Sequence, residues 1–260
     1  MDYEVIDFHT HPFWEPSQNI CHHKEACNMS AGNTRVLMEN LGITKICGSV
    51  LRPGQKNVPV KWNMIRQLND DALRLQKIYG DFYVPGFHVH PHFVKESCEE
   101  IERMAGLGIK LIGELCPYMH GNWSYDESGF DTILECAEAH GMVISFHGMF
   151  EDAMDNMVKR HPNTVLISAH PGEYKEFMRN MKRMAWSKNF YMDVSGYGIF
   201  RYGMLRYAID RYGAERFIFG SDYPTCNPAM YLGGVMMDPL LAEDEKKAIL
   251  SGNIKRILNI

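Results

Sequence analysis

Short apolar runs alternate with longer amphipathic stretches along almost the whole chain. Eight of these runs are rich in β-branched and aromatic residues, which is typical of buried strands. They cover residues 3–9, 43–50, 82–89, 109–115, 142–147, 164–170, 189–195 and 216–222. The stretches between them space their apolar side chains at threes and fours. Residues 60–80 are the longest example and end at Gly80, which predicts a helix with a glycine stop.

Eight strands that alternate with helices in 260 residues fit the size of a (β/α)8 TIM barrel. We therefore predict an α/β protein with a distorted barrel, formed by a single domain over residues 1–260. A doubly wound open sheet is the structural alternative. It would place a glycine-rich phosphate loop after an early strand, and the sequence has none there.

Composition narrows the class of protein. The net charge of −5 gives no basic footprint for nucleic acid, and no apolar run reaches membrane-spanning length. The acidic N-terminus leads directly into a strand pattern, so no signal peptide is expected. The seven cysteines are scattered and include no C-x-x-C pair, which favours reduced thiols. We expect a cytoplasmic protein with a small-molecule substrate and no nucleic-acid or membrane partner; a homo-oligomer is compatible with the sequence.

The first strand ends in two histidines one residue apart, within the sequence VIDFHTHPF at residues 5–13. With 12 histidines in the chain, about half of one such pair is expected by chance, so the motif alone decides little. Residues two apart on a strand point to the same side, so His9 and His11 can reach one cation. Pro12 cannot continue the ladder of hydrogen bonds and ends the strand.

Other residues able to bind a metal also lie at predicted strand ends. The carboxyl ends of barrel strands form one mouth, so residues distant in sequence converge there. Their imidazole and carboxylate groups suit Zn²⁺, and also Fe, Mn or Ni. The predicted metal ligands are His9, His11, Glu114, His147, His170 and Asp222.

With these residues at the strand ends, the chain resembles the amidohydrolase superfamily, and most closely its amidohydrolase 2 branch of metal-dependent hydrolases and decarboxylases. The matching segments are IDFHTH (6–11), SFHG (145–148), HPNTVLISAHPG (161–172), NFYMDVSG (189–196), ERFIFGSDYP (215–224) and GNIKRIL (252–258). They are distributed along the whole chain, and their order and spacing both fit the branch. The resemblance implies a TIM barrel with a metal centre, whereas it says little about the substrate.

The resemblance also implies roles for individual residues. His9, His11, His147 and Asp222 would face the metal, and His170 would bind a second metal or act as a catalytic partner beside a single one. Many members of the superfamily carry a carboxylated lysine on the fourth strand, where this chain has Glu114. A glutamate there can bridge two ions, so the number of ions stays open. Asp222 and His170 are the predicted catalytic residues.

Four functional hypotheses follow. The first, which the sequence favours, is a metal-dependent hydrolase: a cation, most simply Zn²⁺ and alternatively Mn or Fe, activates water to cleave a C–O or C–N bond of a small substrate, and Asp222 moves the proton. The second is a non-oxidative decarboxylase of an aromatic or unsaturated acid. The third is a nuclease similar to the TatD family, which shares a GE motif but lacks the FGSDYP ending found here. The fourth is a barrel that binds partners without catalysis.

Substrate contacts are predicted in the loops after the strands. Arg52 can hold a carboxylate or phosphate through its fork of hydrogen bonds, and Tyr118 and His120 can line the site. Two further histidine-rich segments are weaker candidates for metal sites. FHVHPHF (87–93) places one histidine near the pocket, and CHHKEAC (21–27) is expected at its rim.

Overall fold

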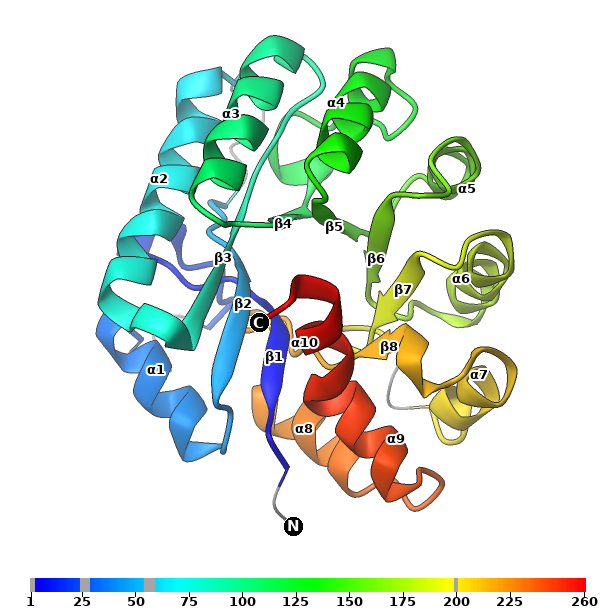
Figure 1. The fold of residues 1–260 in the computed structure, drawn as a ribbon. Helices are drawn as coiled ribbons and strands as arrows, with labels where there is room; N and C mark the ends of the chain where they lie inside the picture. Colours follow the sequence, from blue (N-terminus) through cyan, green and yellow to red (C-terminus); the bar gives the residue numbers. More distant parts are fainter. Residues whose placement is uncertain (1–2, 24–28, 54–58, 199–200) are drawn as a thin grey trace.

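A computed structural model describes residues 3–23, 29–53, 59–198 and 201–260. Eight parallel strands lie side by side in the order β1 to β8, and the helices surround them (Figure 1). The strands are β1 Ile6–Thr10, β2 Lys45–Ser49, β3 Tyr83–Phe87, β4 Leu111–Leu115, β5 Val143–His147, β6 Val165–Ala169, β7 Phe190–Asp193 and β8 Phe217–Ile218. The helices are α1 Ala31–Asn40, α2 Trp62–Tyr79, α3 Val94–Gly106, α4 Ser128–Ala139, α5 Glu151–Arg160, α6 Tyr174–Trp186, α7 Met204–Tyr212, α8 Pro228–Met236, α9 Glu243–Lys247 and α10 Asn253–Leu258.

The first and last strands meet and complete the barrel. Thr10 forms a parallel bridge with Tyr223, and the amide of Phe8 donates to the carbonyl of Phe219 at 3.0 Å. Together with the sheet order, this seam confirms the predicted (β/α)8 architecture. The eighth strand is much shorter than the predicted 216–222. Regular pairing ends at Ile218, and at Gly220 an added Cβ would lie 2.6 Å from the Cβ of His9.

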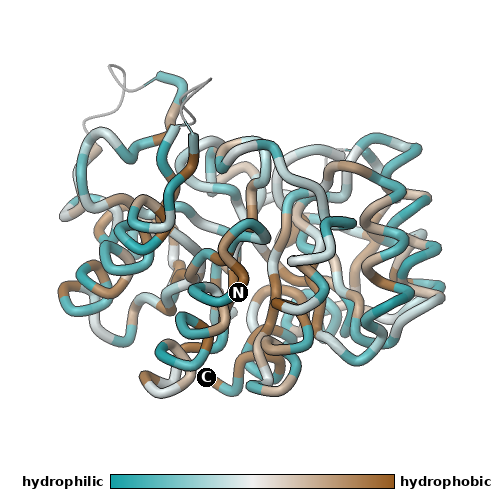
Figure 2. The backbone as a smooth tube through the Cα atoms, turned by 90° about the horizontal axis from the view of Figure 1, so that it is seen from above, coloured by the Kyte–Doolittle hydropathy of each residue, from teal (hydrophilic) through white to brown (hydrophobic). Residues whose placement is uncertain are grey.

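Apolar side chains form two separate clusters. The larger cluster lies between the strands and the surrounding helices, whose outward positions are hydrophilic (Figure 2). The smaller cluster fills the barrel from residues such as Leu111 and Val143, which begin β4 and β5. Ile254 and Leu258 of α10 join this inner cluster, and α10 lies across the barrel in Figure 1. The amino ends of the strands are therefore plugged, which leaves the carboxyl ends for chemistry.

Among the described residues, no helix combines the length and the apolar character that a membrane span requires.

A buried arginine joins α5 to α6. The Arg183 side chain is fully buried and donates to Asp155 Oδ1 at 2.7 Å and to Glu151 Oε2 at 2.6 Å. Its third partner is Asn180 Oδ1, also at 2.7 Å. Burial of the guanidinium is tolerated because each side of its fork has a hydrogen-bonding partner.

We expect Arg183→Met to lower the free energy of unfolding by about 3 kcal/mol, because it leaves buried acceptors without their donor. Arg179→Met is the matched control. The Arg179 side chain is 32% exposed and contacts the same Asp155, so its loss should cost about 1 kcal/mol or less. Urea unfolding of the three proteins measures both values. Equal decreases in the free energy of unfolding for the two variants would show that burial does not make the contacts of Arg183 more stabilising than those of Arg179.

Candidate metal centre

Three side chains converge at the carboxyl ends of β1 and β4. The Nε2 atoms of His9 and His11 are 3.1 Å apart, and Glu114 Oε2 lies 3.2 Å from the first and 3.3 Å from the second. All three side chains are almost completely buried. Nitrogen ligands of one transition-metal ion lie about 3–3.4 Å apart in octahedral or tetrahedral coordination. The spacing of these atoms therefore suits ligands that share one cation.

The hydrogen bonds of the two histidines leave their Nε2 atoms free. His9 Nδ1 lies 2.8 Å from Asp193 Oδ2, and His11 Nδ1 lies 3.1 Å from the carbonyl oxygen of Ser49. Both partners accept, so each Nδ1 carries the proton and each Nε2 presents a lone pair. Two lone pairs that face each other at 3.1 Å repel unless a proton or a cation lies between them.

Glu114 connects this pair to two further histidines. Its Oε1 atom lies 2.9 Å from His147 Nδ1 and 3.9 Å from His170 Nε2. The rings of His147 and His170 pack edge to face at 5.0 Å between centroids. Glu114 therefore stands between two donor groups, His9 with His11 on one side and His147 with His170 on the other.

Asp222 and His170 both lie on backbone with positive φ, at 62° and 66°. Asp222 lies four residues beyond the end of β8, and its Oδ1 atom is 3.6 Å from Nε2 of both His9 and His11. Its side chain does not cap a helix, because α8 begins later with Asn227 as its N-cap. The left-handed turn instead aims the carboxylate at the histidine pair.

His170 is held by a short chain of hydrogen bonds. Its Nδ1 atom lies 2.9 Å from Ser195 Oγ, which donates to Asp193 Oδ1 at 2.5 Å. Gly196 follows, with a φ of 59°, and a Cβ there would lie 2.3 Å from His170 Nδ1. The segment after β7 thus supports both His170 and His9, whose Nδ1 atom also contacts Asp193.

Coupled charges shift the pKa values of the cluster. Burial opposes the charged form of His9, but the carboxylates of Glu114 and Asp193 raise its pKa well above the usual value. Burial likewise opposes ionisation of Glu114, yet His9 and His147 hold its pKa well below the usual range. Burial, followed by the charge of His9, lowers the pKa of His170. In the absence of a cation, protonated imidazole therefore supplies the positive charge that the carboxylates require.

The donor set fits a divalent cation. The ion pairs that Glu114, Asp193 and Asp222 form within the described residues all go to histidines, with no lysine or arginine in the cluster. Three groups of buried or partly buried histidines and carboxylates there have ligand atoms within 4.8 Å of one another. Buried carboxylates without a permanent cation need a metal or bound protons for charge balance.

The predicted substrate contacts lie around this cluster. Tyr118 is 48% exposed, and its ring centroid is 5.0 Å from that of His147. His120 is buried, and Arg52 follows β2 with a buried Nε atom that has no hydrogen-bond partner among the described residues. All three residues follow strands at the same end of the barrel as the candidate metal-binding cluster.

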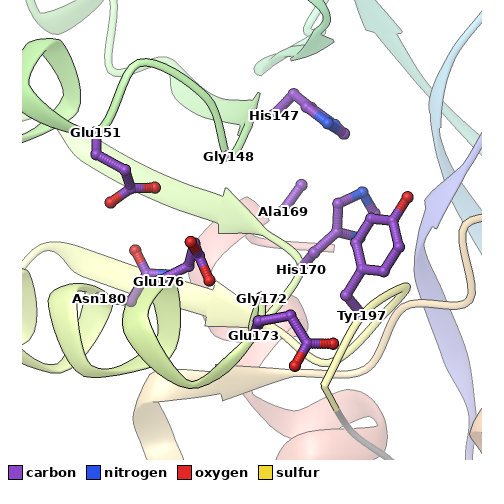
Figure 3. Close-up of a pocket in the computed structure, with 10 residues that line it drawn as sticks. All are labelled: His147, Gly148, Glu151, Ala169, His170, Gly172, Glu173, Glu176, Asn180 and Tyr197. Atoms are coloured by element: carbon purple, nitrogen blue, oxygen red, sulfur yellow. The ribbon is translucent and has the colours of Figure 1, made fainter.

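A pocket of about 280 Å³ opens beside His147 and His170 (Figure 3). Ala169 and Gly148 contribute little side-chain bulk, and Tyr197 stands near His170. The opposite side comes from α5 and α6 and is lined by Glu151, Glu173, Glu176 and Asn180. The pocket gives a small molecule access to the histidines from the β5–β6 side.

The histidines of FHVHPHF (87–93) do not form a metal site of their own. His88 Nε2 donates to the carbonyl of Val50, His90 Nε2 donates to the carbonyl of His120, and exposed His92 pairs with Glu127. The three rings therefore have separate partners. Part of the other segment, residues 24–27 of CHHKEAC, lies outside the described residues.

Sequence reasoning assigned no role to Asp193, Ser195 or Asp7. Asp193 and Ser195 occur in the NFYMDVSG segment, and the available signal was their position at the end of a strand. Asp7 faces the seam, where its carboxylate accepts from the amide and hydroxyl of Ser221 at 2.9 and 2.5 Å. Asp7 and Asp193 thus support the backbone segments that carry the predicted ligands.

The burial of Asp7 predicts that the free energy of unfolding depends on pH. Burial raises its pKa to about 7 from 3.8, against the opposing hydrogen bonds from Ser221. The folded state then binds the proton more tightly than the unfolded state, so the free energy of unfolding falls as pH rises from about 4 to 7. Asp7→Asn should remove on the order of 4 kcal/mol of this fall.

Urea unfolding of chelator-treated protein between pH 4.5 and 7.5 measures the effect. Exposed Asp81→Asn serves as the control and should follow the wild-type pH dependence. Parallel curves for wild type and Asp7→Asn would mean that Asp7 ionises normally in the folded protein.

Comparison with known proteins places this architecture in a family. The family model described as Amidohydrolase matches residues 6–260, whereas the comparison with curated proteins gives no match. Among solved structures, 5-carboxyvanillate decarboxylase LigW from Sphingomonas paucimobilis is similar, with a TM-score of 0.76, 17% identity and 100% of both chains covered.

Two other structures extend the range of chemistry. A dihydroxybenzoic acid decarboxylase from Polaromonas sp. JS666, with bound manganese and the inhibitor 2-nitroresorcinol, has a TM-score of 0.70 at 17% identity, with 99% of this chain and 97% of that chain covered. A probable 2-pyrone-4,6-dicarboxylic acid hydrolase from Acinetobacter baumannii has a TM-score of 0.68 at 13% identity, with coverage of 99% and 100%. These likenesses establish the fold, and the match over residues 6–260 shows that this chain belongs to the amidohydrolase family.

Proposed function

We propose that this protein is a divalent-metal-dependent enzyme that removes CO₂ from a small aromatic or unsaturated acid without oxidation. The observation that carries the proposal is the convergence of His9, His11 and Glu114 on one point, with Asp222 facing it. Several structural neighbours are decarboxylases, and two of them hold manganese, which suits mixed imidazole and carboxylate ligands. Zn²⁺ is the alternative ion.

His9, His11, Glu114 and Asp222 would hold the ion, and His147 or His170 would complete the site. When bound, the ion would polarise an oxygen of the substrate and neutralise its charge. Glu114 and Asp222 together offset a divalent charge, so the resting site would be close to neutral and could accept an anion. Arg52, whose Nε atom is buried without a partner among the described residues, is the proposed contact for the carboxylate.

Loss of CO₂ leaves a ring carbon that must receive a proton. Asp222 is the best-placed group, because its side chain faces the histidine pair and is 12% exposed, so it can take a proton from solvent. His170 stands across the cluster and donates from its Nδ1 atom to Ser195 Oγ, so its Nε2 atom presents a lone pair that can accept a proton or a hydrogen bond from the substrate. We therefore propose both residues as the catalytic groups, with Asp222 as the proton donor to the ring.

Hydrolysis is the second candidate function. It is favoured by the likeness to the probable pyrone hydrolase, and the same Asp222 could take a proton from water. The two reactions differ in their use of water. Hydrolysis adds an oxygen atom from water to the product, whereas decarboxylation exchanges a carboxylate for a hydrogen atom.

The test uses protein loaded with Mn²⁺ or Zn²⁺ and three probes: 2,6-dihydroxybenzoate, 5-carboxyvanillate and 2-pyrone-4,6-dicarboxylate. We expect metal-dependent CO₂ release from an aromatic acid in ¹⁸O water, with no ¹⁸O in the aromatic product. Binding of 2-nitroresorcinol to the loaded protein is expected as well. Ring opening of the pyrone with one ¹⁸O incorporated would favour the hydrolase instead. No turnover of any probe and no metal uptake would refute both reactions.

A further inference from the structure

A group of buried nitrogen atoms near the metal-binding cluster lacks partners. Within the described residues these atoms are Arg52 Nε, His88 Nδ1, His120 Nε2 and Trp123 Nε1, and they belong to residues that follow β2, β3 and β4. Buried polar atoms without hydrogen bonds are rare, because they lose water and gain nothing in return. Their gathering at one side of the barrel mouth indicates a place where a ligand supplies the missing partners.

His88 presents a bare acceptor to this place. Its Nε2 atom lies 2.8 Å from the carbonyl oxygen of Val50, so Nε2 carries the proton and Nδ1 has a free lone pair. The residue is 1% exposed, and burial lowers its pKa to about 4, which keeps the ring neutral near pH 7. His88 Nδ1 can therefore accept a hydrogen bond but cannot donate one.

His120 packs against His88. The two rings meet edge to face with centroids 4.9 Å apart, and the carbonyl of His120 accepts from His90 Nε2 at 2.8 Å. That bond fixes the position of the loop. Burial also lowers the pKa of His120 well below the usual value, so it is neutral and can carry its proton on Nε2. The pair then offers one acceptor and one donor on two rings that pack against each other.

The pair is close to the proposed metal ligands. His88 follows β3, between β2, which holds His11 through Ser49, and β4, which carries Glu114. It lies near enough for the charges of His11 and Glu114 to act on its ring. The strand order thus places His88 at the barrel mouth, beside the strand that holds His11 and the strand that carries Glu114.

We propose that His88 and His120 form a subsite for a hydroxyl group on the substrate ring, which donates to His88 Nδ1 and accepts from His120 Nε2–H. This inference rests on the proposed function and names its substrate class as hydroxylated ring acids. A carboxylate or methoxy group cannot donate to His88, and an ammonium group cannot accept from His120. The subsite therefore selects a hydroxyl by chemistry as well as by size.

The test compares three probes by calorimetry on Mn²⁺-loaded protein. 2-Nitroresorcinol has the second hydroxyl, 2-nitrophenol lacks it, and 3-methoxy-2-nitrophenol carries a methoxy group there. We expect wild type to bind 2-nitroresorcinol at least about tenfold more tightly than either of the others. His88→Phe and His120→Phe should abolish this preference while metal content and 2-nitrophenol affinity stay within about twofold. His88→Gln, which keeps an acceptor, should restore part of it.

His92→Phe is the matched control, because His92 lies in the same segment but its side chain is 60% exposed. It should keep the full preference. Equal binding of the three probes by wild type would overturn the subsite. So would a crystal structure with bound 2-nitroresorcinol in which a water molecule, and not the ligand, forms the hydrogen bonds to His88 Nδ1 and His120 Nε2. CO₂ release without probe discrimination would refute the subsite alone. Absence of metal uptake, CO₂ release and probe binding together would refute the proposed function and the subsite with it.

Discussion

Glu114→Gln will lower the affinity of the protein for Mn²⁺ or Zn²⁺ by at least about 100-fold and reduce turnover to a small fraction of the wild-type rate. The reason is its position between both groups of histidines, with one oxygen near His9 and His11 and the other near His147. Glutamine keeps the size of the side chain but removes the charge that offsets the cation. Elemental analysis after loading and desalting measures the metal content.

The same experiment decides the number of ions. We expect about one equivalent in wild type and a large loss in Glu114→Gln. Two equivalents that fall to one would identify Glu114 as a bridge between two ions, with His170 as a ligand. An unchanged content in the variant would contradict any role of Glu114 as a ligand. Glu99→Gln, at a side chain 62% exposed on α3, is the control and should keep wild-type metal content.

Asp222→Asn should lower kcat by about 10²–10⁴-fold, the usual contribution of a general acid or base. Asparagine keeps an oxygen that can face the metal, so metal content should stay above half of the wild-type value. The kcat is measured with the substrate that the CO₂ assay identifies. Asp210→Asn on α7, where the side chain is 59% exposed, should leave kcat unchanged.

Two outcomes would contradict this role of Asp222. A kcat within threefold of wild type would exclude Asp222 as the group that transfers the proton. A loss of kcat that matches the loss of metal, and that excess Mn²⁺ restores, would make Asp222 a ligand only. The pH dependence of kcat in the wild type should show one ionisation that the asparagine variant lacks.

The strand pattern was sufficient to predict the fold, because parallel barrel strands are buried on both faces and appear as continuous apolar runs. It was also sufficient to predict that His9, His11, Glu114, His147 and His170 approach one another, since each lies within one residue of the carboxyl end of a strand. Asp222 also approaches them, but by a route that the pattern does not contain. The chain leaves the ladder after Ile218, and a left-handed turn brings the carboxylate back.

Supporting residues could not be predicted from periodicity. Asp193 and Ser195 act through hydrogen bonds to rings from other strands, and a contact of that kind depends on three-dimensional placement. The same holds for His88. Its place after β3 was evident from the sequence, whereas its fixed tautomer depends on the carbonyl of Val50 after β2. Strand position thus predicts which side chains reach the mouth, and only the structure shows which atom each one offers.

Because the candidate ligands lie on both sides of the seam between β1 and β8, a bound metal would also affect the stability of the barrel. His9 and His11 come from the first strand, Asp222 from the segment after the last, and the amide of Asp222 donates to the carbonyl of His9 at 2.7 Å. An ion held there would cross-link the first and last strands of the barrel, which are otherwise joined by few hydrogen bonds. Because an ion that binds only the folded chain stabilises it by mass action, the melting temperature should rise with free metal concentration. Amide hydrogens along the seam should exchange faster after chelation, while those in the middle of the sheet keep their protection.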